Sequence, residues 1–133
     1  MTTTDTSEDT RVRVVLVDDS KQVRTVLRLA LEADGRFEVV AEGHNGKEGA
    51  ELSALHQPDI VVTDYLMPDM DGVTSIPLIR KGAPDAKILV YSSQGIVDNE
   101  PAATAAGADA YFEKYARPSD VVVAITSLAG LDD

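Results

Sequence analysis

Polar side chains stand at the ends of four apolar segments of this 133-residue chain. Asp18 and Asp19 follow the first segment and Asp64 follows the third, while Ser92 and Lys114 follow the fourth and fifth. In a parallel sheet, ligands bind where the carboxyl ends of the strands meet. We therefore expect three carboxylates, a hydroxyl and an ammonium group to converge at one edge of a sheet.

Three carboxylates at one edge repel each other, by roughly 4 kcal/mol for each pair that is 4 Å apart in an effective dielectric of about 20. Lys114 supplies only one positive charge against them, and no His or Cys stands at a strand end to favour a transition metal. A hard divalent cation is expected to balance the charge. Mg²⁺ fits best, because it combines one or two carboxylates with waters and a phosphate.

A phosphoryl group would use the remaining side chains, because each of its three outer oxygens needs a compensating partner. Mg²⁺ can take one oxygen, the Lys114 ammonium another, and the Ser92 hydroxyl the third. The nucleophile is then a carboxylate, which is a recognised route to an aspartyl phosphate. The protein contributes mainly positioning and charge neutralisation to such a transfer.

The elements that must position these groups follow from the hydrophobic pattern. Apolar runs predict buried strands at 12–17, 37–41, 60–63, 88–91 and 110–112. Helical spacing and capping signals predict helices at 20–34, 45–55 and 72–80, one after Asn99 with Pro101 in its first turn, and a last one from Pro118 through Leu128. Strands that alternate with helices predict an α/β fold with a doubly wound parallel sheet of five strands and five helices.

Composition narrows the class of protein. The net charge of -11, from 12 basic and 23 acidic residues, argues against DNA and against an anionic membrane surface as partners. No segment approaches the roughly 20 apolar residues of a membrane span, and residues 1–10 form an acidic tail without the pattern of a secretory signal. We expect a cytoplasmic protein with a disordered tail at 1–10, one domain at 11–130 and a C-terminal end at 131–133.

Other polar residues are expected to lie around the site or on the surface rather than to take part in the chemistry. Asp69, Asp71 and Glu113 are expected at the rim of the site, with Asp71 also a candidate cap for the third helix. His44 and His56 are expected on the surface, without partners.

Four segments, in this order, carry a resemblance to a known family: Val-Asp-Asp-Ser at 17–20, Asp-Tyr-Leu-Met-Pro-Asp-Met-Asp-Gly at 64–72, Ser-Ser at 92–93, and Gly-Ala-Asp-Ala-Tyr-Phe-Glu-Lys at 107–114. Over about residues 11–130, the chain resembles the receiver domains of two-component response regulators. The resemblance implies a flavodoxin-like sheet with strand order 2-1-3-4-5. It also implies that Asp64 accepts phosphate from a histidine kinase or a phosphotransfer protein.

The same resemblance implies roles for single residues. Asp19 and Asp64 would be direct Mg²⁺ ligands, Asp18 would help through water, and the backbone carbonyl of Leu66 would complete the protein's share of the coordination. Ser92 and Tyr111 would form a switch pair, in which the hydroxyl moves toward the phosphoryl group while the ring turns inward. The downstream target stays open, and another protein or a second copy of the chain would fit.

One position departs from the commonest family pattern. The family's lysine is usually followed by proline, but Tyr115 follows Lys114 here and proline comes only at Pro118. A trans bond is expected after Lys114, because a non-proline cis bond costs about 3 kcal/mol. This spacing is similar to that of receivers that precede LuxR-type helix-turn-helix domains. No such domain follows in this sequence, so we expect a stand-alone receiver that signals through an interaction surface.

Two other functions remain open. A phosphatase or phosphotransferase of the haloacid-dehalogenase type also uses an aspartate at a strand end, but generally carries a second Asp two residues later, where Leu66 stands. A scaffold or dimerisation module that works without phosphate would have little reason to keep mutually repelling carboxylates. The expectation is a phosphoacceptor signalling protein rather than an enzyme, and slow self-dephosphorylation is compatible with it.

Overall fold

A computed structural model of the chain describes residues 11–65, 67–92, 96–113 and 117–131. The strands are β1 (Val12–Val17), β2 (Phe37–Gly43), β3 (Ile60–Thr63), β4 (Lys87–Ser92) and β5 (Ala110–Glu113). The helices are α2 (Lys21–Asp34), α3 (Gly46–His56), α4 (Gly72–Gly82), α5 (Ile96–Ala106) and α6 (Pro118–Leu128). None of these helices is long and apolar enough to cross a membrane.

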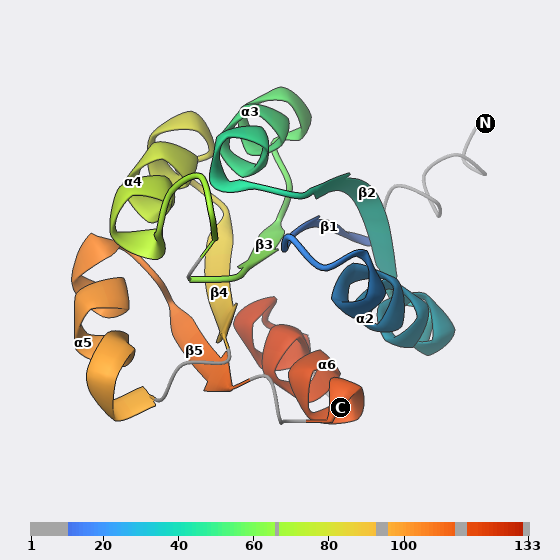
Figure 1. The fold of residues 1–133 in the computed structure, drawn as a ribbon. Coiled ribbons are helices and arrows are strands. Elements are labelled where there is room, and N and C mark those ends of the chain that lie inside the picture. The colour runs from blue at the N-terminus through green and yellow to red at the C-terminus, as the bar shows by residue number, and fades with distance from the viewer. Residues whose placement is uncertain (1–10, 66, 93–95, 114–116, 132–133) are drawn as a thin grey trace.

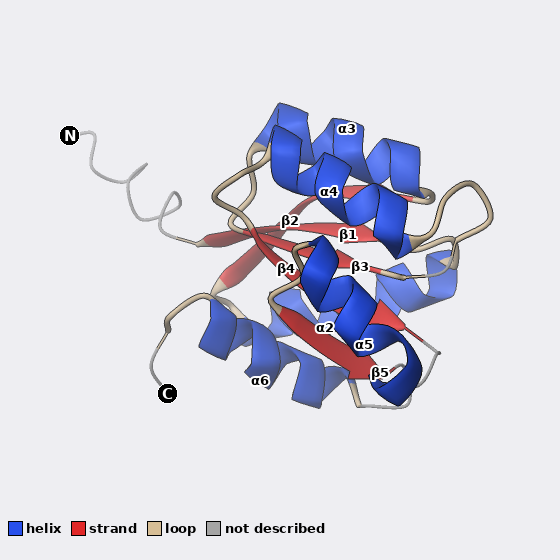
Figure 2. Ribbon diagram, turned by 90° about the vertical axis from the view of Figure 1, so that its left-hand side faces the viewer, coloured by secondary structure: helices blue, strands red, loops and turns tan. Residues whose placement is uncertain are grey.

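The strands form one parallel sheet in the order β2-β1-β3-β4-β5, with helices on both faces (Figure 1). Figure 2 shows α3 and α4 on one side of the sheet and α2 and α6 on the other. The predicted doubly wound sheet with order 2-1-3-4-5 is therefore confirmed. Because the chain reverses its direction of winding between β1 and β3, the carboxyl ends of these two strands flank the crevice in which such folds bind ligands.

The core consists of two layers, one on each face of the sheet. Val14 of β1 belongs to a buried cluster with Leu31 of α2 and Ile125 of α6. Val15, the next residue, belongs to the opposite cluster with Ile76 of α4. Successive side chains of a strand point to opposite faces, so a central strand that is covered on both faces must be apolar throughout. This is why β1 reads as a nearly continuous hydrophobic run, in which Arg13 stands only in the less buried first part.

Strand β2 is longer than its apolar pattern predicts. The expected end was Ala41, but Glu42 and Gly43 still pair with the last residues of β1, after a register shift between Val14 and Val15. An edge strand needs only one buried face, so a polar residue does not end it. The extension brings the Glu42 carboxylate to the end of the sheet that carries the acidic residues.

Helix α5 begins earlier than expected. The helix starts at Ile96 rather than after Asn99, which places Pro101 sixth in the helix instead of in its first turn. Proline removes one backbone hydrogen bond from a helix interior, but the preceding turn is still formed. The start of α5 that was predicted from the position of Pro101 was therefore wrong.

The predicted caps differ in their outcome. Ser20 accepts a hydrogen bond from the Val23 amide (3.2 Å), and Asn45 accepts one from the Glu48 amide (2.8 Å), as N-cap side chains do. Asp71 occupies the N-cap position of α4, but its side chain makes no capping hydrogen bond. Asp71 therefore stands at the predicted cap position, but it does not cap the helix with its side chain.

Arg80 of α4 connects this helix to the neighbouring strands. Its guanidinium donates hydrogen bonds to the carbonyls of Ala86 and Gly107 (the latter at 2.8 Å) and to the Asp109 carboxylate (2.9 Å). Asp109 also accepts a hydrogen bond from the Ile88 amide (2.8 Å). One side chain thus ties α4 to the beginnings of β4 and β5.

We predict that Arg80→Met lowers the free energy of unfolding by about 2 kcal/mol, because it removes the guanidinium that donates to two partly buried carbonyls and to the Asp109 carboxylate. The control is Lys81→Met at the next, exposed position, which should change it by less than about 0.5 kcal/mol. Urea unfolding followed by circular dichroism measures both values. Equal effects of the two substitutions would contradict the assigned role of Arg80.

Candidate functional site

Three carboxylates gather at the carboxyl ends of β1 and β3. One oxygen each of Asp18, Asp19 and Asp64 lies within 4.8 Å of the others. Asp18 and Asp64 are only 3% and 5% exposed, whereas Asp19 is exposed to solvent. The structure therefore brings together the three acidic residues that the sequence places at strand ends, with one side of the cluster accessible.

Backbone amides orient the two buried carboxylates. The Asp64 amide donates to the Val17 carbonyl (2.9 Å), which aligns the loop after β3 with the end of β1. The Tyr65 amide then donates to Oδ1 of Asp64 (2.7 Å), and the Ser20 amide donates to Oδ1 of Asp18 (2.8 Å). Hydrogen bonds from N–H groups to carboxylates are charge-assisted, so they compensate part of the negative charge that the fold concentrates here.

This cluster fits a hard divalent cation. All of the candidate metal ligands in the cluster are carboxylate oxygens, which Mg²⁺ prefers. The three oxygens lie within 4.8 Å of one another. In the octahedral shell of Mg²⁺, opposite oxygens are about 4.2 Å apart and adjacent ones about 3 Å, so the three side chains can reach one ion by closing in on it. The predicted backbone ligand Leu66 and the predicted phosphate partner Lys114, with the Lys114–Tyr115 bond, lie outside the described residues.

The two predicted switch residues lie on the neighbouring strands. Ser92 is the last residue of β4 and is fully buried. Thr63 pairs with Val90, so Asp64 and Ser92 lie one and two residues beyond the last paired position of β3 and β4. Tyr111 of β5 is 7% exposed.

The Tyr111 ring packs beside the residue that follows Asp64. Its centroid is 6.4 Å from that of Tyr65, with the rings tilted by 55°. Burial raises the pKa of Tyr65, and the nearby Asp71 carboxylate and Tyr111 add to the increase. A Cβ at Gly72 would overlap the Tyr65 ring, so the chain can return past this tyrosine only with glycine at that position.

Arg24 and Glu42 belong to this site, although the sequence analysis did not single them out. Arg24 donates to the backbone carbonyl of Asp18 (2.5 Å) and to the Glu42 carboxylate (3.0 Å). The second arginine at this carboxylate, Arg28, donates to it at 2.5 Å. The spacing of Arg24 and Arg28, four residues apart on one helix, was visible, but their shared partner lies on a strand distant in sequence.

Asp69 has a larger role than the expected position at the rim. Its carboxylate accepts hydrogen bonds from the amides of Gly46 (2.9 Å) and Lys47 (3.0 Å), the first two residues of α3. It therefore caps that helix from a distant loop and anchors the segment that follows Asp64. Burial raises the pKa of Asp69, but these backbone hydrogen bonds more than offset it and hold the pKa below its usual value.

His44 also differs from expectation. It is largely exposed, as predicted, but its Nδ1 lies 2.8 Å from a Glu48 carboxylate oxygen. The same oxygen accepts a hydrogen bond from the His44 amide (2.9 Å). The expectation that His44 has no partner was therefore wrong, and the pair forms part of the start of α3.

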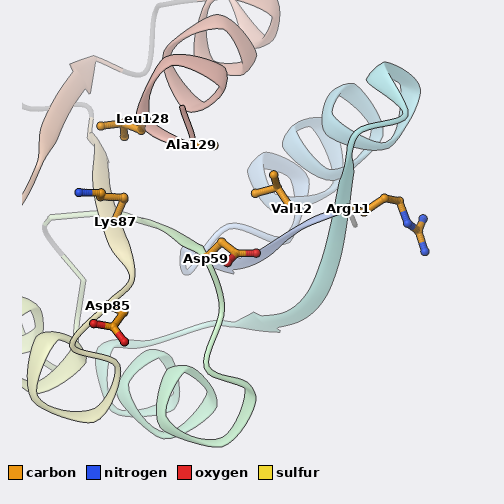
Figure 3. A pocket seen from close by; sticks show the side chains of 7 residues that line it. All are labelled: Arg11, Val12, Asp59, Asp85, Lys87, Leu128 and Ala129. Carbon is orange, nitrogen blue, oxygen red and sulfur yellow. The ribbon is translucent and has the colours of Figure 1, made fainter. Parts of the chain in front are cut away.

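A cavity of about 410 Å³ lies at the opposite, amino-terminal edge of the sheet (Figure 3). Its lining includes Asp59, Asp85 and Lys87, together with the end of α6. Figure 3 shows the charged ends of Arg11 and Lys87 extending away from its centre. Because these acidic and basic groups do not converge on a common point, this hollow is a poorer candidate for chemistry than the carboxylate cluster.

Comparison with known proteins agrees with this geometry. The model of the response regulator receiver domain family matches residues 14–126. The chain belongs to this family. The receiver is 38% identical over 117 residues to the chemotaxis protein CheY of Thermotoga maritima, covering 88% of this chain and 97% of that protein. It is 36% identical over 115 residues to the response regulator VraR of Staphylococcus saprophyticus, covering 86% of this chain and 54% of that protein.

Solved structures of receivers have the same fold. The signal receiver domain of the response regulator NarL from Mycobacterium tuberculosis superposes with a TM-score of 0.85 at 30% identity, covering 90% of this chain and 97% of that one. A LuxR-family response regulator from an Aurantimonas species gives a TM-score of 0.83 at 34% identity, covering 91% and 87%. The resemblance read from the sequence motifs is thus confirmed. The receiver spans about half the length of VraR and nearly all of CheY.

We predict that Asp69→Ala lowers the free energy of unfolding by about 1 kcal/mol, the usual cost of losing a helix cap. Asp71→Ala is the matched control, because Asp71 lies in the same loop without a capping bond. Chemical unfolding near neutral pH measures both. Equal losses would contradict the capping role.

This stabilisation should depend on pH. Because the pKa of Asp69 is lower in the folded protein, its contribution is complete above the unfolded pKa of about 3.9 and is lost as the pH falls through the folded value. The difference between wild type and Asp69→Ala should therefore shrink on acidification.

Proposed function

We propose that this receiver accepts a phosphoryl group on Asp64 from a histidine kinase or a phosphotransfer protein, with Mg²⁺, and signals through a protein-interaction surface. The observation that carries the proposal is the carboxylate cluster. Asp64 lies nearly buried beside Asp18 and the accessible Asp19, at the switch point of a receiver-family sheet. No output domain is needed for the chemistry itself.

The proposed transfer is a displacement at phosphorus. A carboxylate oxygen of Asp64 forms the new P–O bond while the P–N bond of the donor phosphohistidine breaks, and the departing imidazole keeps the bonding electron pair and takes up a proton. Asp18, Asp19, Asp64 and the Leu66 carbonyl are the proposed holders of Mg²⁺, which supplies charge neutralisation when bound. Ser92 and Lys114 are the proposed partners of the phosphoryl oxygens.

The response to phosphorylation is proposed to travel through Ser92 and Tyr111. Ser92 ends β4, and Tyr111 lies on β5 beside Tyr65, the neighbour of the acceptor. Movement of the Ser92 hydroxyl toward the phosphoryl group would change the packing of the Tyr111 ring. The face formed by α5, β5 and α6 adjoins this ring and is the proposed interaction surface.

The partners are proposed at the level of class. The strong negative charge supports contacts with proteins, including a second copy of the chain, rather than with DNA. Action as a stand-alone receiver stays a prediction, because the relatives include proteins of similar length and others about twice as long. The absence of a second Asp at position 66 gives the alternative phosphatase function no comparable support.

We predict that incubation with Mg²⁺ and acetyl phosphate adds one phosphoryl group per chain, measured by intact mass spectrometry. Asp64→Asn should abolish the gain, whereas Asp85→Asn, at the exposed opposite edge, should not reduce it. Chelation of Mg²⁺ should prevent it, because the fixed carboxylates otherwise repel the donor's phosphate. A wild-type protein without the gain, or an undiminished gain in Asp64→Asn, would contradict the proposal. The scaffold alternative would then be favoured.

We predict that Ser92→Ala slows phosphorylation by acetyl phosphate by about tenfold or more, because a buried donor to the developing phosphoryl charge is lost. Ser119→Ala, on the exposed start of α6, is the control and should retain the wild-type rate. Quenched time courses analysed by mass spectrometry give both rates. An unaltered rate in folded Ser92→Ala would remove Ser92 from the proposed site.

A further inference from the structure

We infer that Arg24 is a positioning residue for the metal site, because its guanidinium holds the loop that carries Asp18 and Asp19. The inference rests on the proposed function, of which the metal site is a part. Helix α2, which covers the sheet, and strand β2, which extends it, would thus also help to position the metal ligands.

Arg24 makes two hydrogen bonds from different atoms of one planar group. Nη1 donates to the backbone carbonyl of Asp18 (2.5 Å), and Nε donates to Oε1 of Glu42 (3.0 Å). Its side chain is 13% exposed, compared with 34% for Arg28 on the next turn. A guanidinium held at two points has a fixed orientation that the flexible ammonium of a lysine does not reproduce.

The bonded carbonyl belongs to the peptide group that joins Asp18 to Asp19. Its orientation therefore affects the direction of both carboxylates. The amide on the other side of Asp18 donates to the Gly43 carbonyl (3.0 Å), at the end of β2. Both peptide groups that flank Asp18 are thus tied to the last two residues of β2, one of them directly and the other through Arg24.

Glu42 provides the fixed end of this bridge. Its second carboxylate oxygen accepts a hydrogen bond from Arg28 (2.5 Å). Burial raises the pKa of Glu42, but hydrogen bonds from Arg28 and Arg24 outweigh this effect and lower the pKa below its usual value. Glu42 is therefore ionised at neutral pH and holds both arginines.

Arg24 also lies near two of the residues that carry the carboxylates. A cavity of about 10 Å³ is lined by Asp18, Arg24 and Asp64, among other residues. A positive charge so close to a cation site opposes cation binding by simple electrostatics. The two possible roles of Arg24 thus have opposite signs: its charge alone would weaken metal binding, whereas its positioning of the Asp18–Asp19 loop would strengthen it.

The test measures metal affinity on the full chain without any phosphodonor. Mn²⁺ serves as the probe, and its free concentration is followed by electron paramagnetic resonance. Arg24→Gln should raise the dissociation constant about tenfold, as expected for loss of a group that orients metal ligands. Arg28→Gln removes the same charge one turn away but leaves both hydrogen bonds of Arg24 in place, so its dissociation constant should rise clearly less than that of Arg24→Gln.

Arg24→Lys separates geometry from charge. It keeps the positive charge but cannot form the same two-point bridge, so we expect weakened Mn²⁺ binding here as well. Thermal unfolding without metal identifies any variant that does not fold. If Arg24→Gln does not fold, Arg24→Lys decides the question. Unchanged or tighter Mn²⁺ binding in folded Arg24→Gln, or an unchanged affinity in Arg24→Lys when Arg24→Gln does not fold, would overturn the inference.

The same titration distinguishes this inference from the proposed function. If wild-type protein binds no Mn²⁺, both the inference and the proposed metal site fail. If it binds Mn²⁺ but takes no phosphoryl group from acetyl phosphate, the phosphoacceptor proposal fails while the role of Arg24 is still decided by the affinities. A further expectation is that Arg24→Gln raises the Mg²⁺ concentration needed for half-maximal phosphorylation more than it lowers the maximal rate.

Discussion

Repulsion among three carboxylates is the constraint on which this structure depends. The parallel sheet places Asp18, Asp19 and Asp64 at one edge, two of them nearly buried, with one oxygen of each within 4.8 Å of the others. Such an arrangement costs free energy unless charge and hydrogen bonds compensate it. The backbone amides of Ser20 and Tyr65 supply part of this compensation. A cation bound between the three carboxylates would compensate more of it.

The two loops that carry these carboxylates are held from outside. The loop after β1 is tied to the end of β2 through Arg24 and through the Asp18 amide. The loop after β3 is tied to the start of α3 through the Asp69 carboxylate. One anchor leads to the end of β2, and the other leads to α3, which packs against β2 and β1.

The sequence predicted the strands and most helix boundaries well where periodicity and local chemistry agreed. Val12–Val17 reads as buried because both faces of a central strand are covered, and Ser20 and Asn45 cap their helices through local bonds. The predicted boundaries were wrong where a single residue that usually ends or begins an element was accommodated inside it. Pro101 did not mark the start of α5, and polar Glu42 did not end β2. In both cases the tertiary context outweighed the propensity of one residue.

The sequence by itself determined which carboxylates and which hydroxyl stand at the strand ends. It also determined the family whose motifs they form. These are properties of residue type and spacing, which the alternation of strands and helices converts into one edge. Only the tertiary structure decided which residues hold these side chains in place. Arg24 meets Glu42, and Asp69 meets Gly46, across separations of 18 and 23 residues. No periodicity encodes such pairs, because they arise from the packing of α2 and α3 against the sheet.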